Sequence, residues 1–222
     1  MRRRHPGRNG AGIALACAAA WFLVAPSRAA DPVPESVNLP ALRLDGQPAR
    51  AHTQGLEVVG GHYFVTARRE DVRARRALLL RTDPTRSEWD VWDITPLDTQ
   101  GQATTLDHPG GLQSDGTRLW IPVAESKRNG RTLIRVFPIA GLVSGQAPRP
   151  EREVPVDDHI GALAVSAPLA LLLGASWDTE RVYVWDLEGR LQRKLEGAEL
   201  TSRTLGNGPS LDENPRRTQL GG

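Results

Sequence analysis

The chain has 222 residues, 39% of them hydrophobic and 24% charged, which suits one globular domain with its own core. Its formal net charge of +2 depends on an arginine-rich start: removing the five arginines of the first 30 residues, which hold no acid, leaves 23 basic against 26 acidic residues. This balance gives no reason to expect nucleic-acid binding, and the single cysteine, Cys17, excludes a disulfide framework or a cysteine zinc site in the mature chain.

The first 30 residues have the features of a secretory signal peptide. Four arginines among the first eight residues precede an uncharged run over residues 13–25, and small residues at Ser27 and Ala29 favour cleavage near Ala29 or Ala30. The apolar run is too short for a stable membrane span. We therefore predict a periplasmic or secreted protein, exported most simply by the general secretory route. The twin-arginine route and lipidation at Cys17 stay open as alternatives.

One short pattern, H-x-[QG]-[GA]-L, occurs three times. Its copies begin at His52, His108 and His159, which stand 56 and 51 residues apart. A repeat of about 40–50 residues that opens on a short apolar strand is typical of a β-propeller blade. Three of the four histidines outside the predicted signal peptide occupy this one position of the repeat.

Each copy continues into short apolar or alternating runs separated by turn residues, such as Gly60-Gly61 in the first copy and Asp115-Gly116 in the second. We expect four antiparallel strands in each copy and no helix of any length after the signal. The predicted strands, in chain order, are 55–59, 62–68, 77–82, 88–94, then 112–113, 118–124, 132–139, 152–156, then 160–166, 169–177, 181–186 and 190–195.

The fold predicted from this pattern is an all-β propeller of four-stranded antiparallel blades, with the propeller domain over residues 31–200. Closed propellers need 4–8 blades, whereas residues 52–197 account for three. One more outer strand is expected within 36–44, and residues 201–222 read as an irregular tail. The propeller is thus expected to be incomplete, with about three to four blades, and to be a shortened member of a longer family. Its open edges favour an edge-strand partner or self-association.

Several segments, in order over about residues 50–190, resemble a family of secreted bacterial propeller-like proteins of unknown function. The segments that carry the resemblance are His52–Leu56, Asp107–Leu112, Asp115–Glu125, Asp157–Gly161 and Gly174–Trp177. Members of that family continue with a further histidine-containing blade start, whereas this chain has only Asn207–Asp212 there. The resemblance implies a propeller fold and no particular activity.

A second, weaker resemblance is to the glutamine cyclotransferases, five-bladed propellers that cyclise N-terminal glutamine. Thr53-Gln-Gly-Leu56 followed by a hairpin is similar to their opening blade. Their next strand carries the acidic catalytic residue, and Val65 stands at about that position here. Valine cannot transfer the proton that amide cyclisation needs, so the shared tetrapeptide points to blade structure more than to shared catalysis.

The repeat predicts a shared site, because equivalent residues of successive blades lie on one ring around the propeller axis. The second strand of each blade returns to the face where the first began, which brings carboxylates and an indole to the same rim. We expect His52, His108 and His159 to form the ring and, if a divalent metal is bound, to be its ligands. The neighbouring ligand-binding residues are expected to be Gln54, Glu125, Asp158 and Trp177, with Asp107 or Asp158 orienting the imidazoles.

Three interpretations of the ring stay open. Each histidine can simply cap a neighbouring strand, the three can line a funnel for a small polar ligand, or they can hold one divalent metal ion, the only cofactor considered. The predicted function is accordingly an exported propeller that binds a small polar ligand or metal. An enzyme of hydrolase or glutaminyl-cyclase type is the alternative, with Ser126 near His108 as a conceivable nucleophile.

Overall fold

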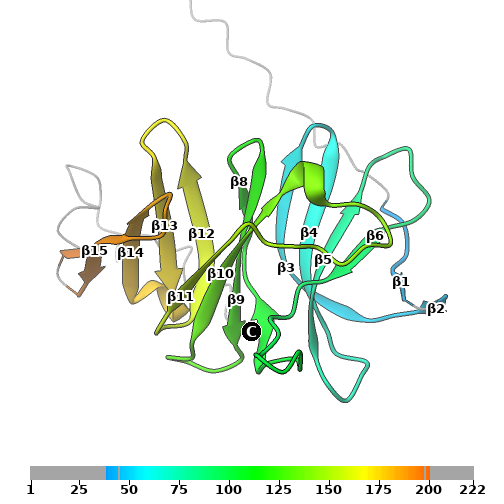
Figure 1. Ribbon diagram of the computed structural model, residues 1–222, viewed down its shortest axis with the longest axis horizontal. Coiled ribbons are helices and arrows are strands. Elements are labelled where there is room, and N and C mark those ends of the chain that lie inside the picture. The colour runs from blue at the N-terminus through cyan, green and yellow to red at the C-terminus, as the bar shows by residue number, and fades with distance from the viewer. Residues whose placement is uncertain (1–38, 45, 198, 201–222) are drawn as a thin grey trace, which may run out of the picture. The chain divides into compact units, whose positions relative to one another are not determined.

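The computed structural model describes residues 39–44, 46–197 and 199–200, so the predicted signal peptide and C-terminal tail lie outside the described residues. Within this part the fold is all-β, as predicted (Figure 1). It contains fifteen strands and two 3₁₀ turns, η1 (Ile139–Gly141) and η2 (Trp177–Thr179). No helix among these residues is long and apolar enough to cross a membrane.

The first sheet is formed by the first copy of the repeat and has the order β3-β4-β5-β6. The predicted alternation and turns appear almost as expected. A Gly60-Gly61 turn with positive φ at both glycines joins the two inner strands. The strands are β3 (Ala51–Val59), β4 (His62–Arg69), β5 (Arg76–Thr82) and β6 (Asp90–Asp93).

The second sheet follows in the same way, with an interrupted inner edge. Two short strands, β7 (Leu106–Pro109) and β8 (Gln113–Ser114), pair with the same neighbour, and the rest of the sheet continues outward from it. That neighbour is β9 (Arg118–Glu125), and the outer strands are β10 (Thr132–Pro138) and β11 (Arg152–Val156).

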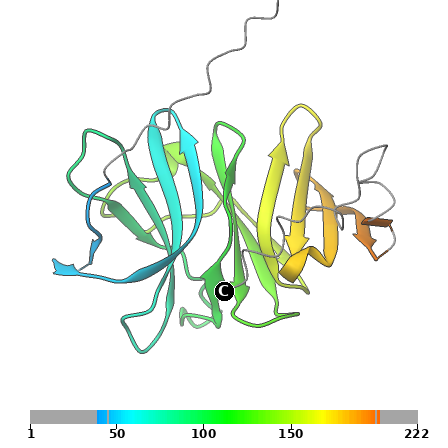
Figure 2. The same ribbon diagram turned by 180° about the vertical axis from the view of Figure 1, so that it is seen from behind.

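The third sheet has the order β12-β13-β14-β15. Its strands are β12 (Ile160–Ser166), β13 (Leu171–Ser176), β14 (Arg181–Asp186) and β15 (Leu191–Glu196). The second sheet lies between the first and the third in both views (Figures 1 and 2). The three repeat copies thus form three separate antiparallel sheets, as the propeller prediction requires, and the fold is propeller-like and incomplete.

The expected extra outer strand does not form from the described part of 36–44. Arg43–Leu44 (β1) pairs instead with Gln47–Pro48 (β2) in a small hairpin of its own. Neighbouring side chains Leu42 and Leu44 pack on the first sheet, and Trp89 Nε1 donates to the carbonyl of Pro40 at 2.7 Å. Pro40 interrupts the alternation, and this segment covers a face of the sheet without adding to its edge.

The core lies between the sheets, and both faces of the second sheet are buried. Successive residues of β9 point to opposite sides, as strand geometry requires. Leu119 and Ile121 pack toward the first sheet in one cluster, and Trp120 packs toward the third sheet in another. The first sheet contributes Phe64, Leu79 and Trp92, and the third sheet contributes Leu172, Tyr183 and Trp185.

The small residues of the repeat lie where the inner strands of successive sheets touch. The Gly111 N–H donates to the carbonyl of Gly161 at 2.8 Å, and Gly111 forms a parallel bridge with Ala162. A Cβ on Gly55 would stand 2.8 Å from Gly111 Cα, and one on Gly110 would stand 2.4 Å from the Gly161 oxygen. Gly55 and Gly110 must therefore be glycine, because at these two positions one backbone lies directly against the next.

Each inner strand also contains a register shift at the motif. The shifts fall between Thr53 and Gly55, between Leu106 and His108, and between Ile160 and Ala162. A bulge breaks the two-residue alternation. The first inner strand begins at Ala51 and the second at Leu106, earlier than the predicted residues 55 and 112, whereas the third begins at Ile160 as predicted.

Adjacent glycines give a matched test of this packing. We expect Gly110→Ala to lower the free energy of unfolding by about 1–3 kcal/mol, because its Cβ would meet a backbone oxygen that cannot move independently. Gly111→Ala should change it by less than about 1 kcal/mol, since the nearest atom to that Cβ is 3.8 Å away. Urea unfolding of both variants measures the difference, and equal losses would contradict the close contact.

Candidate functional site

The three repeat histidines line one open cleft of about 380 Å³ at the end of the inner strands. His52 and His108 are the second and third residues of β3 and β7, and His159 directly precedes β12, so the repeat carries all three to the same side of neighbouring sheets. Of the other predicted site residues, Gln54 and Trp177 also line this cleft. The complete lining consists of His52, Gln54, His108, His159, Gly161, Ala162, Ala175, Ser176, Trp177, Asp178 and Thr179.

Three aromatic rings stand in a row along the cleft. The centroids of His108 and His159 are 5.4 Å apart at 71°, and those of His159 and Trp177 are 4.6 Å apart, also at 71°. Edge-to-face contacts of this kind hold rings in fixed orientations. The row joins the second sheet to the third, and it gives the cleft an aromatic wall with polar ring edges.

His159 caps a strand of the preceding sheet, which is the structural role that the sequence analysis considered for each histidine. Its Nδ1 lies 2.8 Å from the backbone oxygen of Glu125, at the end of β9, and 3.2 Å from that of Lys127. A carbonyl oxygen only accepts hydrogen bonds, so Nδ1 carries the proton. In the neutral ring Nε2 is then an acceptor, and it has no hydrogen-bond partner within the described part of the chain.

His108 has the opposite arrangement. Its Nδ1 lies 2.9 Å from an Nη atom of Arg68, at the end of β4 in the preceding sheet. A guanidinium only donates, so Nδ1 accepts and the proton of the neutral ring is on Nε2. Burial, followed by the positive charge of Arg68, lowers the pKa of His108 to about 4. This ring is therefore neutral at pH 7.

Arg68 also joins Ser126 to this network. The same Nη atom donates to Ser126 Oγ at 2.7 Å, and His108 Nδ1 lies 3.3 Å from that hydroxyl. Because the arginine occupies the imidazole lone pair and keeps the pKa of His108 low, the ring is a weak base for Ser126. Glu70 pairs with the other side of the guanidinium, with 3.0 Å between Oε1 and Nε, and neutralises it.

His52 has no preceding sheet among the described residues to cap. Its Nδ1 lies 3.0 Å from the side-chain amide nitrogen of Gln54, two residues along the same strand. Both side chains stand at the free end of the row, and His52 is exposed. The third member of the ring is thus in the expected place, without the contact that fixes the other two.

Glu125 is a structural carboxylate and does not line the cleft. It accepts hydrogen bonds from Thr105 Oγ1 at 3.0 Å and from the Arg131 backbone N–H at 3.0 Å, and Lys127 Nζ lies 3.1 Å away. The N–H of Arg131, together with these side chains, lowers the pKa of Glu125 to about 2. Its contribution to the site is its backbone oxygen.

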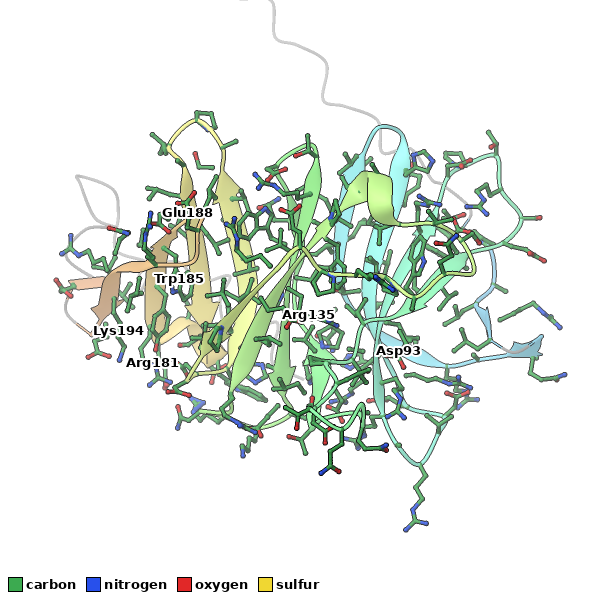
Figure 3. The ribbon with its side chains drawn as sticks, viewed as in Figure 1. Asp93, Arg135, Arg181, Trp185, Glu188 and Lys194 are labelled. Atoms are coloured by element: carbon green, nitrogen blue, oxygen red, sulfur yellow. The ribbon has the colours of Figure 1, made fainter. Side chains whose placement is uncertain are left out.

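Asp158 is also a structural carboxylate and does not line the cleft. It is 2% exposed, and its carboxylate accepts from Arg181 Nε at 2.6 Å and from the Tyr183 hydroxyl at 2.8 Å (Arg181 is labelled in Figure 3). Burial opposes ionisation, but these hydrogen bonds prevail and lower its pKa. It accepts the backbone N–H of His159 at 2.9 Å and does not contact the imidazole, so it positions the residue and not the ring.

Trp177 stands on a strained turn. Asp178 and Thr179, the next two residues, have φ of 57° and 58°, a region that non-glycine residues and β-branched ones above all rarely adopt. Arg128 holds the turn from the second sheet, with 2.7 Å to Asp178 Oδ2 and 2.9 Å to Glu180 Oε1. The sequence placed Trp177 on this rim, but no local signal marked Arg128, which comes from a distant loop.

No group of three or more histidine, cysteine, aspartate or glutamate side chains in the described ranges is arranged to hold a metal ion. The protonation of His108 supplies a reason. Its Nδ1 lone pair is occupied by Arg68 and its Nε2 carries hydrogen, so neither nitrogen is free to bind a cation. Metal ligation by His52, His108 and His159 stays a prediction that this geometry does not favour.

The state of His108 can be measured directly. In an NMR titration we expect a pKa of about 4 and an Nε2–H tautomer, and Arg68→Met should raise the pKa partway toward its usual value of about 6.5. Between pH 6.5 and pH 4, His108 is protonated in the unfolded chain and neutral in the folded chain. Stability should therefore fall as the pH drops through that window, and less steeply in Arg68→Met.

Arg69→Met is the matched control for this titration. Arg69 is the next residue of β4 and pairs with Asp71 at 2.9 Å, so its loss should leave the pKa of His108 unchanged. A wild-type pKa near 6.5, or equal effects of the two substitutions, would contradict the assignment.

Comparison with known proteins gives a family and no activity. No curated protein matches the chain. Residues 91–203, half of the sequence, match the family described as "Family of unknown function (DUF6454)". An uncharacterised family was expected, whereas the resemblances to secreted bacterial propellers and to glutamine cyclotransferases stay predictions. This chain belongs to DUF6454, a family of unknown function.

Proposed function

We propose that the histidine cleft binds a small, uncharged polar molecule with one flat apolar face. The observation that carries the proposal is the row of His108, His159 and Trp177 along one cleft, with the Nδ1 atom of each imidazole engaged and Nε2 unpaired within the described residues. Concave sites with an aromatic wall and few polar groups are typical of small-molecule binding.

The two imidazoles offer complementary hydrogen bonds. His108 donates through Nε2–H because Arg68 occupies its Nδ1, and His159 accepts through Nε2 because its Nδ1–H points to the Glu125 carbonyl. A ligand with an acceptor next to a donor, such as a sugar diol or a cyclic amide, would satisfy both. Trp177 supplies the surface for its flat face.

The charges around the cleft favour a neutral ligand. The one carboxylate in its lining, Asp178, is paired with Arg128 at 2.7 Å. His108 is neutral at pH 7 because its pKa is low, and Arg68 is paired with Glu70. An ionic ligand would have to lose hydration without a free countercharge from these groups.

The enzyme alternative receives less support. Ser126 lacks a competent base in His108, as described above. Val65, at the position of the acidic residue in the cyclotransferases, packs with Leu80 and Leu42 in the apolar cluster on the outer face of the first sheet. It therefore points away from the cleft, and binding without chemistry is the simpler proposal.

We place this binding outside the cytoplasm, in the periplasm or the surrounding medium, on the strength of the signal-like first 30 residues. N-terminal sequencing of exported protein tests that part separately. A chain that still begins with Met1, or with an acylated Cys17, would contradict it.

The binding proposal is tested with a probe set of monosaccharides, nucleosides and cyclic amides, screened by ligand-observed NMR. We expect at least one class to bind, and Trp177→Ala and Gln54→Ala to weaken it by at least about tenfold, a loss of about 1.4 kcal/mol or more. His62→Ala is the control, because His62 lies on a hairpin away from the cleft. Binding that survives both cleft variants, or none by any probe class, would overturn the proposal.

A further inference from the structure

Two sheet faces of this fold are apolar and have no further sheet of the described chain against them. The leading face is the side of the first sheet that points away from the second. Leu56 pairs with Val65, Val65 with Leu80 and Leu80 with Val91, so these four side chains share that face. On the inner strand the face is open to solvent: Leu56 is 59% and Val58 is 53% exposed.

The trailing face is the side of the third sheet that points away from the second. The registers place Ala175 opposite Val182 and Leu173 opposite Val184, while Tyr183 and Trp185 point the other way into the core. Leu173, Ala175, Val182 and Val184 are all partly exposed. The trailing face thus carries small and branched apolar side chains over β13 and β14, and Arg193 of the edge strand β15 stands beside Val184, paired with Glu199 at 3.0 Å.

The repeat indicates what covers these faces. The leucine of the motif packs against the preceding sheet wherever one exists: Leu112 is 5% exposed in the cluster with the first sheet, and Leu163 packs in the cluster with the second. Leu56 has the same place in its own copy and meets no further sheet of the described residues. By analogy with Leu112 and Leu163, Leu56 should pack against the outward face of a neighbouring sheet, and the trailing face of the third sheet is such a face.

We propose that two copies of this chain close a ring of six sheets, with the leading face of each packed on the trailing face of the other. A twofold axis makes the two junctions identical. Six blades lie within the range in which propellers close, and closure removes the open sides that the three described sheets leave. We choose a second copy as the occupant because it would cover at once both faces that the described sheets leave open.

The N-terminal segment leaves room for such a junction. Leu42 and Leu44 pack over the outer part of the leading face, and the indole of Trp89 is tied to Pro40 there. Further along the inner strand β3, no described residue of the chain covers Leu56 and Val58. At the two existing junctions the closest approach is also between inner strands, through Gly55 against Gly111 and Gly111 against Ala162.

A histidine contact gives independent support. His108 contacts the end of β4 in the sheet before it, and His159 contacts the end of β9. His52 has only Gln54 of its own strand. In the ring it would face the end of β13 of the second copy, where Ser176 and Trp177 stand. The second copy would then complete the row of rings in the cleft.

Light scattering of the purified exported chain, at about micromolar concentration, tests the proposal. We expect a particle of twice the monomer mass. Leu56→Arg or Val184→Arg should each weaken association by at least about 100-fold, because either buries an unpaired guanidinium at both junctions. Leu97→Arg is the control: Leu97 is also exposed, at 63%, but lies in a loop outside both faces.

Mixing Leu56→Arg with Val184→Arg distinguishes the loss of an interface from the misfolding of a variant. One junction of the mixed pair carries both substitutions and the other carries none, so a mixture should associate where neither variant does alone. A monomeric wild type, an open-ended series of larger particles, or equal effects from Leu97→Arg would overturn the ring. A monomer that still binds the cleft probes would leave the binding proposal standing.

Discussion

The close approach of inner strands is the constraint on which the rest of this fold depends. At the motif, the backbone of one sheet lies against the backbone of the next, with Gly55 facing Gly111 and Gly110 facing Gly161. Contact at this distance fixes the register between sheets as well as within them. The hydrophobic clusters on either side of β9 then fill the space that this contact leaves between the outer strands.

The same five residues of the motif hold the sheets together and build the cleft. The glycines permit the contact. In the second and third copies the leucine also packs on the preceding sheet, and the histidine Nδ1 contacts the end of a strand in that sheet. Capping and binding are therefore compatible, because His108 and His159 each use Nδ1 for a structural contact and leave Nε2 for a ligand. The repeated histidine in the sequence could not by itself distinguish a capping role from a binding role.

Periodicity predicted the strands well, since runs such as Arg181–Asp186 alternate cleanly and their turns carry glycine or Asp-Gly pairs. The bulges were not predicted, because one extra residue leaves no trace in composition. Within the site, repeat position located the histidines and Trp177. It could not show that Asp158 is engaged by Arg181 and Tyr183, or that Arg68 sets the proton of His108, because those partners lie 23 to 40 residues away in sequence.

The two imidazoles differ in how they tolerate sequence change. His159 owes its tautomer to a main-chain oxygen, which every amino acid at positions 125 and 127 provides. His108 owes its tautomer to one guanidinium, which a single substitution removes. Substitution of the surrounding side chains would therefore leave the hydrogen-bond acceptor of the cleft, His159 Nε2, unchanged. The donor, His108 Nε2–H, would change with the residue at position 68. Ligand preference in related chains can thus evolve at position 68 without disturbing the backbone contacts that hold the sheets together.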